Sequence, residues 1–284
     1  MSYARHQTFH LRAGWLAKVI ESLGHSENLR LFNKPDAAAE LGIGKNMVQA
    51  LRFWVKAAGL VEVNRNGELA LSTFGKLAST YDPFFELDLT WWLIHTHLVS
   101  SKSEATAWHF LFNKYPGTET DRESFVDALA RYQAGASPSA ISRSSFYKDF
   151  DCIMGTYVLT NRASETPEDN IVCPLTRLGL LEQLRNGRVR KVAPSHNIPL
   201  SVAFAVLHPA LGLRLTLSEI EEAEGNLAKT FNLSVDTVYR YLDLLKNRGL
   251  VSFSRTAGID TVVLEGVSHW ALIEDEYKVL GGST

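Results

Sequence analysis

Hydrophobic positions recur at helical spacing near the start of the chain and predict three helices there. The first covers residues 12–23 and ends at Gly24, a residue type that commonly follows a helix. A second, short helix over residues 35–41 begins with a proline, which the first helical turn tolerates. The third covers residues 45–58 and follows the Gly-Ile-Gly sequence at 42–44. We therefore expect a tight turn between the second and third helices.

The third predicted helix has two faces of opposite character. Its apolar stripe consists of Met47, Val48, Leu51, Trp54 and Ala58. The other face carries long donor side chains, namely Lys45, Gln49, Arg52 and Lys56, with Asn46 beside them. This pattern is typical of a DNA recognition helix. In such a helix Lys45 and Arg52 would contact guanine edges or phosphate, and Asn46 and Gln49 could read adenine. The charge pattern alone is equally typical of a solvated helix face.

Two short alternating runs follow this helix and predict an antiparallel hairpin. They cover residues 60–63 and 68–71 and flank the turn sequence Asn64-Arg65-Asn66-Gly67. Three helices, a tight turn and a trailing hairpin are the ingredients of a winged helix-turn-helix. We therefore expect an N-terminal winged helix over residues 1–80, and Arg65 joins the candidate DNA contacts.

From residue 81 the pattern changes to aromatic-rich helices. Residues 87–99 are apolar around most of the helix circumference, which predicts a buried helix that packs on the aromatic residues at 108–112. Further helices are expected over 121–132 and 144–157, and residues 161–170 have the composition of a mobile loop. We expect a helical middle domain over residues 81–215.

A basic hairpin is predicted within this middle domain, near residues 184–192. Asn186-Gly187 lies between alternating residues, which is a strong short-range hairpin signal. The flanking cations are Arg185, Arg188, Arg190 and Lys191, which would form a phosphate-contacting arm. The alternative is a charged sheet edge that prevents unwanted strand pairing.

The C-terminal third repeats the order of elements seen at the start. Helices are expected over 218–224 and 227–231 and, after a Ser234 cap, over 235–247, followed by strands over 250–253 and 259–264. This predicts a second winged helix over residues 216–284. The expected fold class is therefore mainly α with small β wings, with two winged helix-turn-helix modules flanking a helical middle region. Residues 281–284 are expected to be disordered.

Outward positions of the last predicted recognition helix carry different chemistry from those of the first. Asp236 and Asp243 would repel phosphate, although Tyr239 and Arg240 could still contact DNA. The net charge of −2 also divides unevenly, into +4 for residues 1–80, −1 for 81–215 and −5 for 216–284. We expect the first segment to face double-stranded DNA and the acidic C-terminal module to bind a protein partner. A homodimer is compatible with this pattern.

Composition places the chain among ordinary globular proteins. It has 284 residues, of which 45% are hydrophobic and 21% charged, enough for two or three modules. The apolar runs are shorter than the ~20 residues that cross a bilayer, and the first residues lack the apolar core of a signal peptide. We expect no membrane contact and a cytoplasmic location. Cys152 and Cys173 are expected to be reduced packing residues.

Several segments together resemble a bacterial family known as domain of unknown function 4007. They are residues 8–16, 41–48, 81–115, 148–157 and 173–180, of which Gly-Lys-Asn-Met-Val at 44–48 and the tryptophan-rich block are the most specific. The resemblance implies an association with DNA phosphorothioate modification, the replacement of a non-bridging phosphate oxygen by sulfur, within anti-phage defence. It further implies the role of a DNA-nicking partner of the sulfur-transfer enzymes.

Nicking would require carboxylates that hold a divalent metal, so Mg²⁺ or Mn²⁺ is expected only if the protein is a nickase. Asp260 with Glu276 and Lys278 matches the D…E-x-K pattern of many metal nucleases, which is a weak signal. Asp149 and Asp151 lie two residues apart on a predicted helix and so do not face one ligand. We assign no catalytic and no metal-binding residue from the sequence.

These patterns favour a double-stranded DNA-binding component of a bacterial DNA phosphorothioation system, which engages target DNA and would nick it if it is an enzyme. Two alternatives stay open. One is a non-enzymatic winged-helix transcriptional regulator, which would bind an operator, and the other is an assembly scaffold for the sulfur-modification enzymes.

Overall fold

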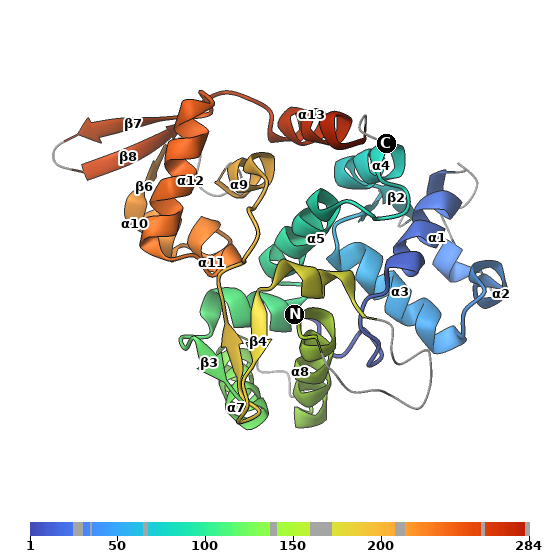
Figure 1. The fold of residues 1–284 in the computed structure, drawn as a ribbon. Helices are drawn as coiled ribbons and strands as arrows, with labels where there is room; N and C mark the ends of the chain where they lie inside the picture. The colour runs from blue at the N-terminus through green and yellow to red at the C-terminus, as the bar shows by residue number, and fades with distance from the viewer. Residues whose placement is uncertain are drawn as a thin grey trace.

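Helices build most of the protein, and short antiparallel strands join or cap them (Figure 1). The computed structural model describes residues 1–24, 31–34, 36–64, 68–136, 141–159, 172–207, 214–256 and 259–281. The expectation of a mainly α fold with small β elements is confirmed. In the part of the chain that the structure describes, no helix combines the length and the apolar character needed to cross a membrane.

The N-terminal elements have nearly the expected bounds. They are α1 (Ala13–Gly24), the 3-10 helix η1 (Leu31–Asn33), α2 (Ala37–Leu41), α3 (Lys45–Ala57), β1 (Val61–Val63), β2 (Leu69–Leu71) and α4 (Thr73–Tyr81). Gly42 ends α2 with φ = 62°, a left-handed conformation that glycine adopts without steric penalty. β1 pairs with β2 in the register Val63 to Leu69. Arg65 and the turn around it lie outside the described residues.

The middle region contains the expected helices and several elements that the sequence did not predict. In chain order they are α5 (Asp88–Ser100), α6 (Thr106–His109), the π-helical turn η2 (Phe110–Lys114), β3 (Glu119–Thr120), α7 (Arg122–Ala136), α8 (Arg143–Tyr157), the 3-10 helix η4 (Pro174–Leu178), β4 (Leu181–Gln183), β5 (Val189–Lys191) and α9 (Leu200–Leu207). The predicted hairpin is present as β4 and β5, and β3 adds a third strand beside β5. The loop predicted at 161–170 lies outside the described residues.

The C-terminal elements again follow the prediction, with additions at both ends. They are β6 (Arg214–Thr216), α10 (Leu217–Glu222), α11 (Leu227–Phe231), α12 (Val235–Asn247), β7 (Val251–Thr256), β8 (Ile259–Leu264) and α13 (His269–Gly281). Ser234 caps α12 as expected, because its side chain accepts a hydrogen bond from the Thr237 backbone N–H. β6, β8 and β7 form one antiparallel sheet in that order. Residues 282–284 lie beyond the described part.

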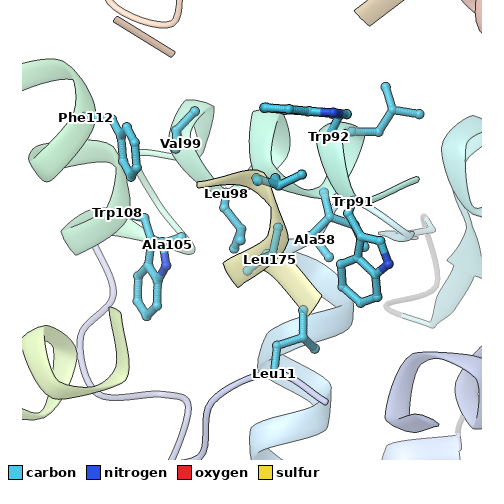
Figure 2. Close-up of a cluster of buried hydrophobic side chains, with 14 of the residues drawn as sticks. Leu11, Ala58, Trp91, Trp92, Leu98, Val99, Ala105, Trp108, Phe112 and Leu175 are labelled. Carbon is cyan, nitrogen blue, oxygen red and sulfur yellow. The ribbon is translucent and has the colours of Figure 1, made fainter. Parts of the chain in front are cut away.

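One hydrophobic core runs through the molecule, and α5 lies at its centre. Figure 2 shows Trp91 and Leu98 of α5 among buried neighbours that include Trp108 and Leu175. This confirms the expectation that the tryptophan-rich block is core. The two cysteines are also buried and free, as expected for packing residues, and burial raises the pKa of Cys173 to about 12.

Two histidines of α5 connect this central helix to opposite ends of the chain. His95 is buried, with Nδ1 2.7 Å from Tyr157 Oη and Nε2 2.8 Å from the Thr230 carbonyl oxygen in α11. His97 stacks on Phe74 of α4 and fills the space above Gly59, where a Cβ atom would lie only 2.3 Å from its ring. Burial lowers the pKa of both imidazoles to about 4.

The last helix, α13, leaves the C-terminal sheet and packs on α4 and α9 (Figure 1). The ring of Tyr277 stacks on Tyr81 with centroids 5.9 Å apart, and the Tyr277 hydroxyl lies 2.8 Å from Thr90 Oγ1. The Tyr81 hydroxyl donates a hydrogen bond to Glu274. α13 therefore connects the C-terminal region to an element of the first 81 residues.

Candidate nucleic-acid interface

The two faces predicted for α3 are present in the structure. Seven of its thirteen residues are buried, and Trp54, with no exposed surface, donates from Nε1 to the carbonyl oxygen of Phe9 at 2.9 Å. On the opposite side Lys45, Asn46, Gln49 and Arg52 are exposed, and Lys56 is half-buried. Burial of the apolar stripe thus fixes the helix with its donor side chains outward.

An N-terminal arm (residues 1–8) lies beside α3, and hydrogen bonds to three other elements hold it there. The Ser2 N–H donates to Thr106 Oγ1 of α6, and the Tyr3 hydroxyl donates to Gln133 of α7. The Ala4 N–H donates to Asp149 Oδ1 of α8 at 2.8 Å. Each partner is more than 100 residues away in sequence. The arm is therefore positioned by tertiary contacts and not by local structure.

His6 and Asp149 form a buried pair beneath this arm. His6 Nε2 lies 2.8 Å from Asp149 Oδ1, and the two side chains are 0% and 2% exposed. The Thr8 N–H points at His6 Nδ1, so Nδ1 accepts and Nε2 carries the proton that is donated to Asp149. Burial raises the pKa of Asp149, and the hydrogen bond from His6 opposes that rise.

The backbone of the arm is strained on both sides of this pair. Ala4, Gln7 and Thr8 have φ of 52°, 51° and 67°, in the left-handed region that non-glycine residues rarely occupy. Each such residue costs about 1–2 kcal/mol relative to ordinary backbone, so the surrounding contacts must hold the arm in place. Strain of this kind clusters at functional sites.

A partly open cleft of about 680 Å³ lies between the arm, α3 and the segment that follows α5. Gln49, Arg52 and Lys56 line it from α3, and Arg5 and Gln7 line it from the arm. Among the residues that line it, the cations Arg5, Arg52 and Lys56 face a single carboxylate, that of Glu104. A concave site with this excess of positive charge favours an anionic ligand.

The cleft thus brings three of the predicted DNA contacts together and adds residues that the sequence did not identify. Lys45 and Asn46 lie outside it, in the first turn of α3. Arg5, Gln7 and Phe32 were missed because no periodic pattern marks them. Arg5 and Gln7 reach the cleft through the contacts of the arm with α6, α7 and α8, whereas Phe32 lines it from η1.

The basic hairpin has a different environment. Arg190 pairs with Glu119 of β3 through Nε at 2.8 Å, and Arg188 lies 3.5 Å from the same carboxylate. Lys191 points inward, where its ammonium donates to the carbonyl oxygens of Leu111 and Tyr115. Burial and the nearby Lys229 lower the pKa of Lys191 to about 8. These contacts support a structural role, in which Arg188 and Arg190 connect the β4–β5 hairpin to β3 and Lys191 connects it to η2, while Arg185 lies at the exposed turn.

The described residues do not show the weak D…E-x-K match, Asp260 with Glu276 and Lys278, as one site. Glu276 accepts a hydrogen bond from the Ser201 N–H, and Lys278 pairs with Glu274 and Asp275 on its own helix. Asp260 pairs with Arg255 beside the turn of the β7–β8 hairpin, whereas Glu276 and Lys278 belong to α13, and the side chain of Asp260 is not described. Throughout the described ranges, no group of three or more His, Cys, Asp or Glu side chains is arranged to hold a metal ion.

Comparison with known proteins relates the chain to one family and to two solved structures. A family model described as "Protein of unknown function (DUF4007)" matches residues 3–277. A structure described as "Magnesium ion-bound SspB crystal structure" is 25% identical with a TM-score of 0.82, and the match covers 99% of this chain and 88% of that one. A second, "SspB crystal structure", has the same identity and coverage with a TM-score of 0.83. None of the curated proteins matches the chain.

Proposed function

Because the chain belongs to the DUF4007 family of proteins of unknown function, we propose that it is the double-stranded DNA-binding component of a bacterial DNA phosphorothioation system in phage defence. The association with sulfur modification follows from the sequence resemblance. The observation that carries DNA binding is α3, whose buried apolar face leaves Lys45, Asn46, Gln49 and Arg52 exposed on one side.

The order of elements supports winged-helix architecture at both ends of the chain. At the N-terminal end, α2, the Gly42 turn and α3 precede the β1–β2 hairpin. At the C-terminal end, α11, a left-handed Asn232 and α12 precede the β7–β8 hairpin. In a winged helix the second helix of each pair is the one that enters the major groove. We assign that role to α3.

The chemistry of α3 fits contact with a duplex. An α-helix fits the width of the major groove, where Arg and Lys pair with guanine edges or phosphate and Asn and Gln pair with adenine. α3 carries three cations and no carboxylate, so its approach to phosphate is not opposed by its own side chains. The exposed Asp236 and Asp243 of α12 support a protein partner instead, so we propose an assembly surface at the other end of the chain.

Strand nicking is the second element of the proposal and rests on the resemblance. Nucleases of this kind usually hold a divalent cation with carboxylates. One of the two similar solved structures is magnesium ion-bound, and that ion belongs to the other protein. The proposal assigns no metal ligand and no nicking residue to this chain.

Two measurements on the purified protein test this function. Duplex binding across a salt series should weaken when Lys45 and Arg52 are both replaced by Ala, because phosphate contacts give binding a steep salt dependence. Incubation with supercoiled plasmid, with and without Mn²⁺ or Mg²⁺, should yield open-circle product if the protein nicks DNA. Unchanged duplex binding by the double variant contradicts the role of α3. Tight binding to one operator without any nicking favours the regulator, and weak DNA binding with stable co-purification of a partner favours the scaffold.

A further inference from the structure

The cleft beside α3 combines a cationic rim with aromatic side chains. Phe32 of η1 and Phe53 of α3 line it together with Arg5, Arg52 and Lys56. We propose that this cleft binds one unpaired nucleotide of the DNA that α3 engages, with its phosphate at the arginines and its base against the aromatic wall. The inference rests on the proposed function and adds the state of the substrate, namely DNA with a nucleotide outside the base stack.

The shape of the site favours a single nucleotide over paired DNA. At about 680 Å³ the cleft lies within the size range of small-ligand pockets. A duplex presents a groove that receives a convex element such as an exposed helix. A concave site on the flank of that helix instead receives a convex group, and a nucleotide turned out of the stack is such a group. The helix and the cleft therefore match different parts of one DNA substrate.

The side chains of the cleft match the phosphate and the base of a nucleotide. Arginine pairs with phosphate through two parallel hydrogen bonds, and the cleft is lined by Arg5 from the arm and by Arg52 from α3. Phe53 is only 6% exposed and is held edge-on between His6 and Trp54, so it forms a fixed floor. The half-buried Phe32 provides a second aromatic surface, and bases stack on such surfaces without regard to sequence.

Polar groups in the cleft can pair with the edge of a base. Gln7 and Gln49 each present an amide that both donates and accepts hydrogen bonds, and the Glu104 carboxylate accepts from an amino group. The same carboxylate repels a phosphate, which places the phosphate toward the three cations. The charge arrangement therefore orients the nucleotide in the cleft.

The arm is prearranged for this task by its own contacts. Arg5 lies between Ala4 and His6, both of which bond to the buried Asp149. Left-handed backbone at Ala4 and Gln7 brackets Arg5, and the buried pair sustains that strain. A fixed arm lowers the conformational entropy lost on binding, as a preformed site requires. His6 and Asp149 are positioning residues in this proposal, and Arg5 is the contact.

Fluorescence anisotropy with three ligands tests the inference on the full chain. They are a fully paired duplex, the same duplex with one bulged nucleotide, and a free deoxynucleoside monophosphate as competitor. We expect the wild type to bind the bulged duplex about tenfold more tightly than the paired one. Arg5→Gln should reduce that preference to less than twofold while paired-duplex affinity stays within twofold, because Arg5 is on the arm and not on α3.

Lys45→Gln is the matched control, since it removes one exposed cation from α3 outside the cleft. It should weaken binding to both duplexes equally. If the wild type binds paired duplex but shows no preference for the bulge, or if Arg5→Gln leaves the preference intact, the inference is overturned and the proposed function stands. Absence of duplex binding contradicts the proposed function itself. Competition by the free monophosphate as strong as that of the bulged duplex shows a free nucleotide to be the ligand and overturns the DNA-borne assignment.

Discussion

The units around α3 and α12 share an order of elements but differ in how deeply their second helix is buried. Both helices have thirteen residues, follow a left-handed residue and precede an antiparallel hairpin. Their fourth, seventh and eleventh residues are buried in both, for example Val48 in α3 and Val238 in α12. α3, however, buries seven residues and α12 only four.

The additional burial of α3 explains where the cleft forms. Phe53 and Trp54, its ninth and tenth residues, pack against the arm and Trp108, whereas the same positions in α12 hold the exposed Asp243 and Leu244. A helix that other elements cover on two sides can form a concave site where its exposed face meets the covering element. A helix that is covered on one side presents a convex surface. Units with a similar order of elements therefore present different surfaces, depending on what packs against the second side of the helix.

The largest effect should come from the tenth residue of each helix. Trp54→Ala removes a fully buried side chain and leaves the Phe9 carbonyl without its donor, which should lower the free energy of unfolding by about 3–5 kcal/mol. Leu244→Ala, at the same position in α12, is 42% exposed and should change it by less than about 0.5 kcal/mol. Urea denaturation followed by circular dichroism measures both. Equal losses would contradict the deeper burial of α3.

Acid should weaken the attachment of both units to α5. The pKa of buried His95 is about 4 in the folded protein, against an ordinary value of 6.5, so between these values the unfolded chain binds a proton that the folded chain does not. Protonation of His95 therefore does not lower the free energy of unfolding above pH 6.5. As the pH falls from 6.5 toward 4, this residue lowers it by up to about 3 kcal/mol. His97 should add a loss in the same direction.

Urea denaturation at pH 7 and pH 5 measures this decline. His95→Gln should flatten it, because glutamine does not titrate, although the variant is less stable at neutral pH. An unchanged pH dependence in His95→Gln would assign the decline to other groups.

Neutralising the outward face of each helix should affect DNA binding unequally. Arg52→Ala should weaken duplex binding by about 1–3 kcal/mol if Arg52 contacts a base, and adding Lys45→Ala should also reduce the salt dependence by about one phosphate. The paired variant Arg240→Ala/Lys246→Ala removes two exposed cations from α12 and should change the affinity less than twofold. Anisotropy titrations at several salt concentrations distinguish the two. A similar loss from both pairs would indicate that overall charge, and not α3, determines binding.

The smallest effect should follow from removing the acids of α12. Asp236→Asn/Asp243→Asn eliminates two exposed carboxylates and should raise duplex affinity by no more than a few-fold, since exposed charges are screened by salt. Glu222→Gln/Glu265→Gln, which removes two exposed carboxylates outside α12, is a control with the same change in net charge. A gain as large as the loss from the α3 variants would show that both helices bind DNA alike.

Local sequence signals predicted most of what these two units share. Helical spacing predicted the bounds of α3 and α12 to within a residue. Ser234 predicted the N-terminal cap of α12, because a serine side chain satisfies a free N–H at a helix start. Such signals depend on neighbours within four residues. They therefore identify the exposed donors of α3 equally well.

The cleft could not be predicted in this way. Its arm is held by Asp149, 143 residues from His6, and no local pattern encodes that distance. The orientation of Lys191 could not be predicted from local sequence either. This residue lies in a basic run, yet its ammonium turns inward because the carbonyl groups of η2 need donors. α13 was missed because only Ile273 and Tyr277 form its buried stripe.

The contact between Tyr81 and Glu274 joins residues 193 positions apart in the chain. A ribosome that adds about 5–20 residues per second needs roughly 10–40 s to synthesise the segment between them. During that interval the surface of α4 that α13 later covers is exposed to solvent or to the ribosome, with the Tyr81 ring uncovered. The yield of native protein should therefore depend on translation speed across this segment and on any chaperone that covers α4 during the interval. The folding rate of either unit should matter less for this yield.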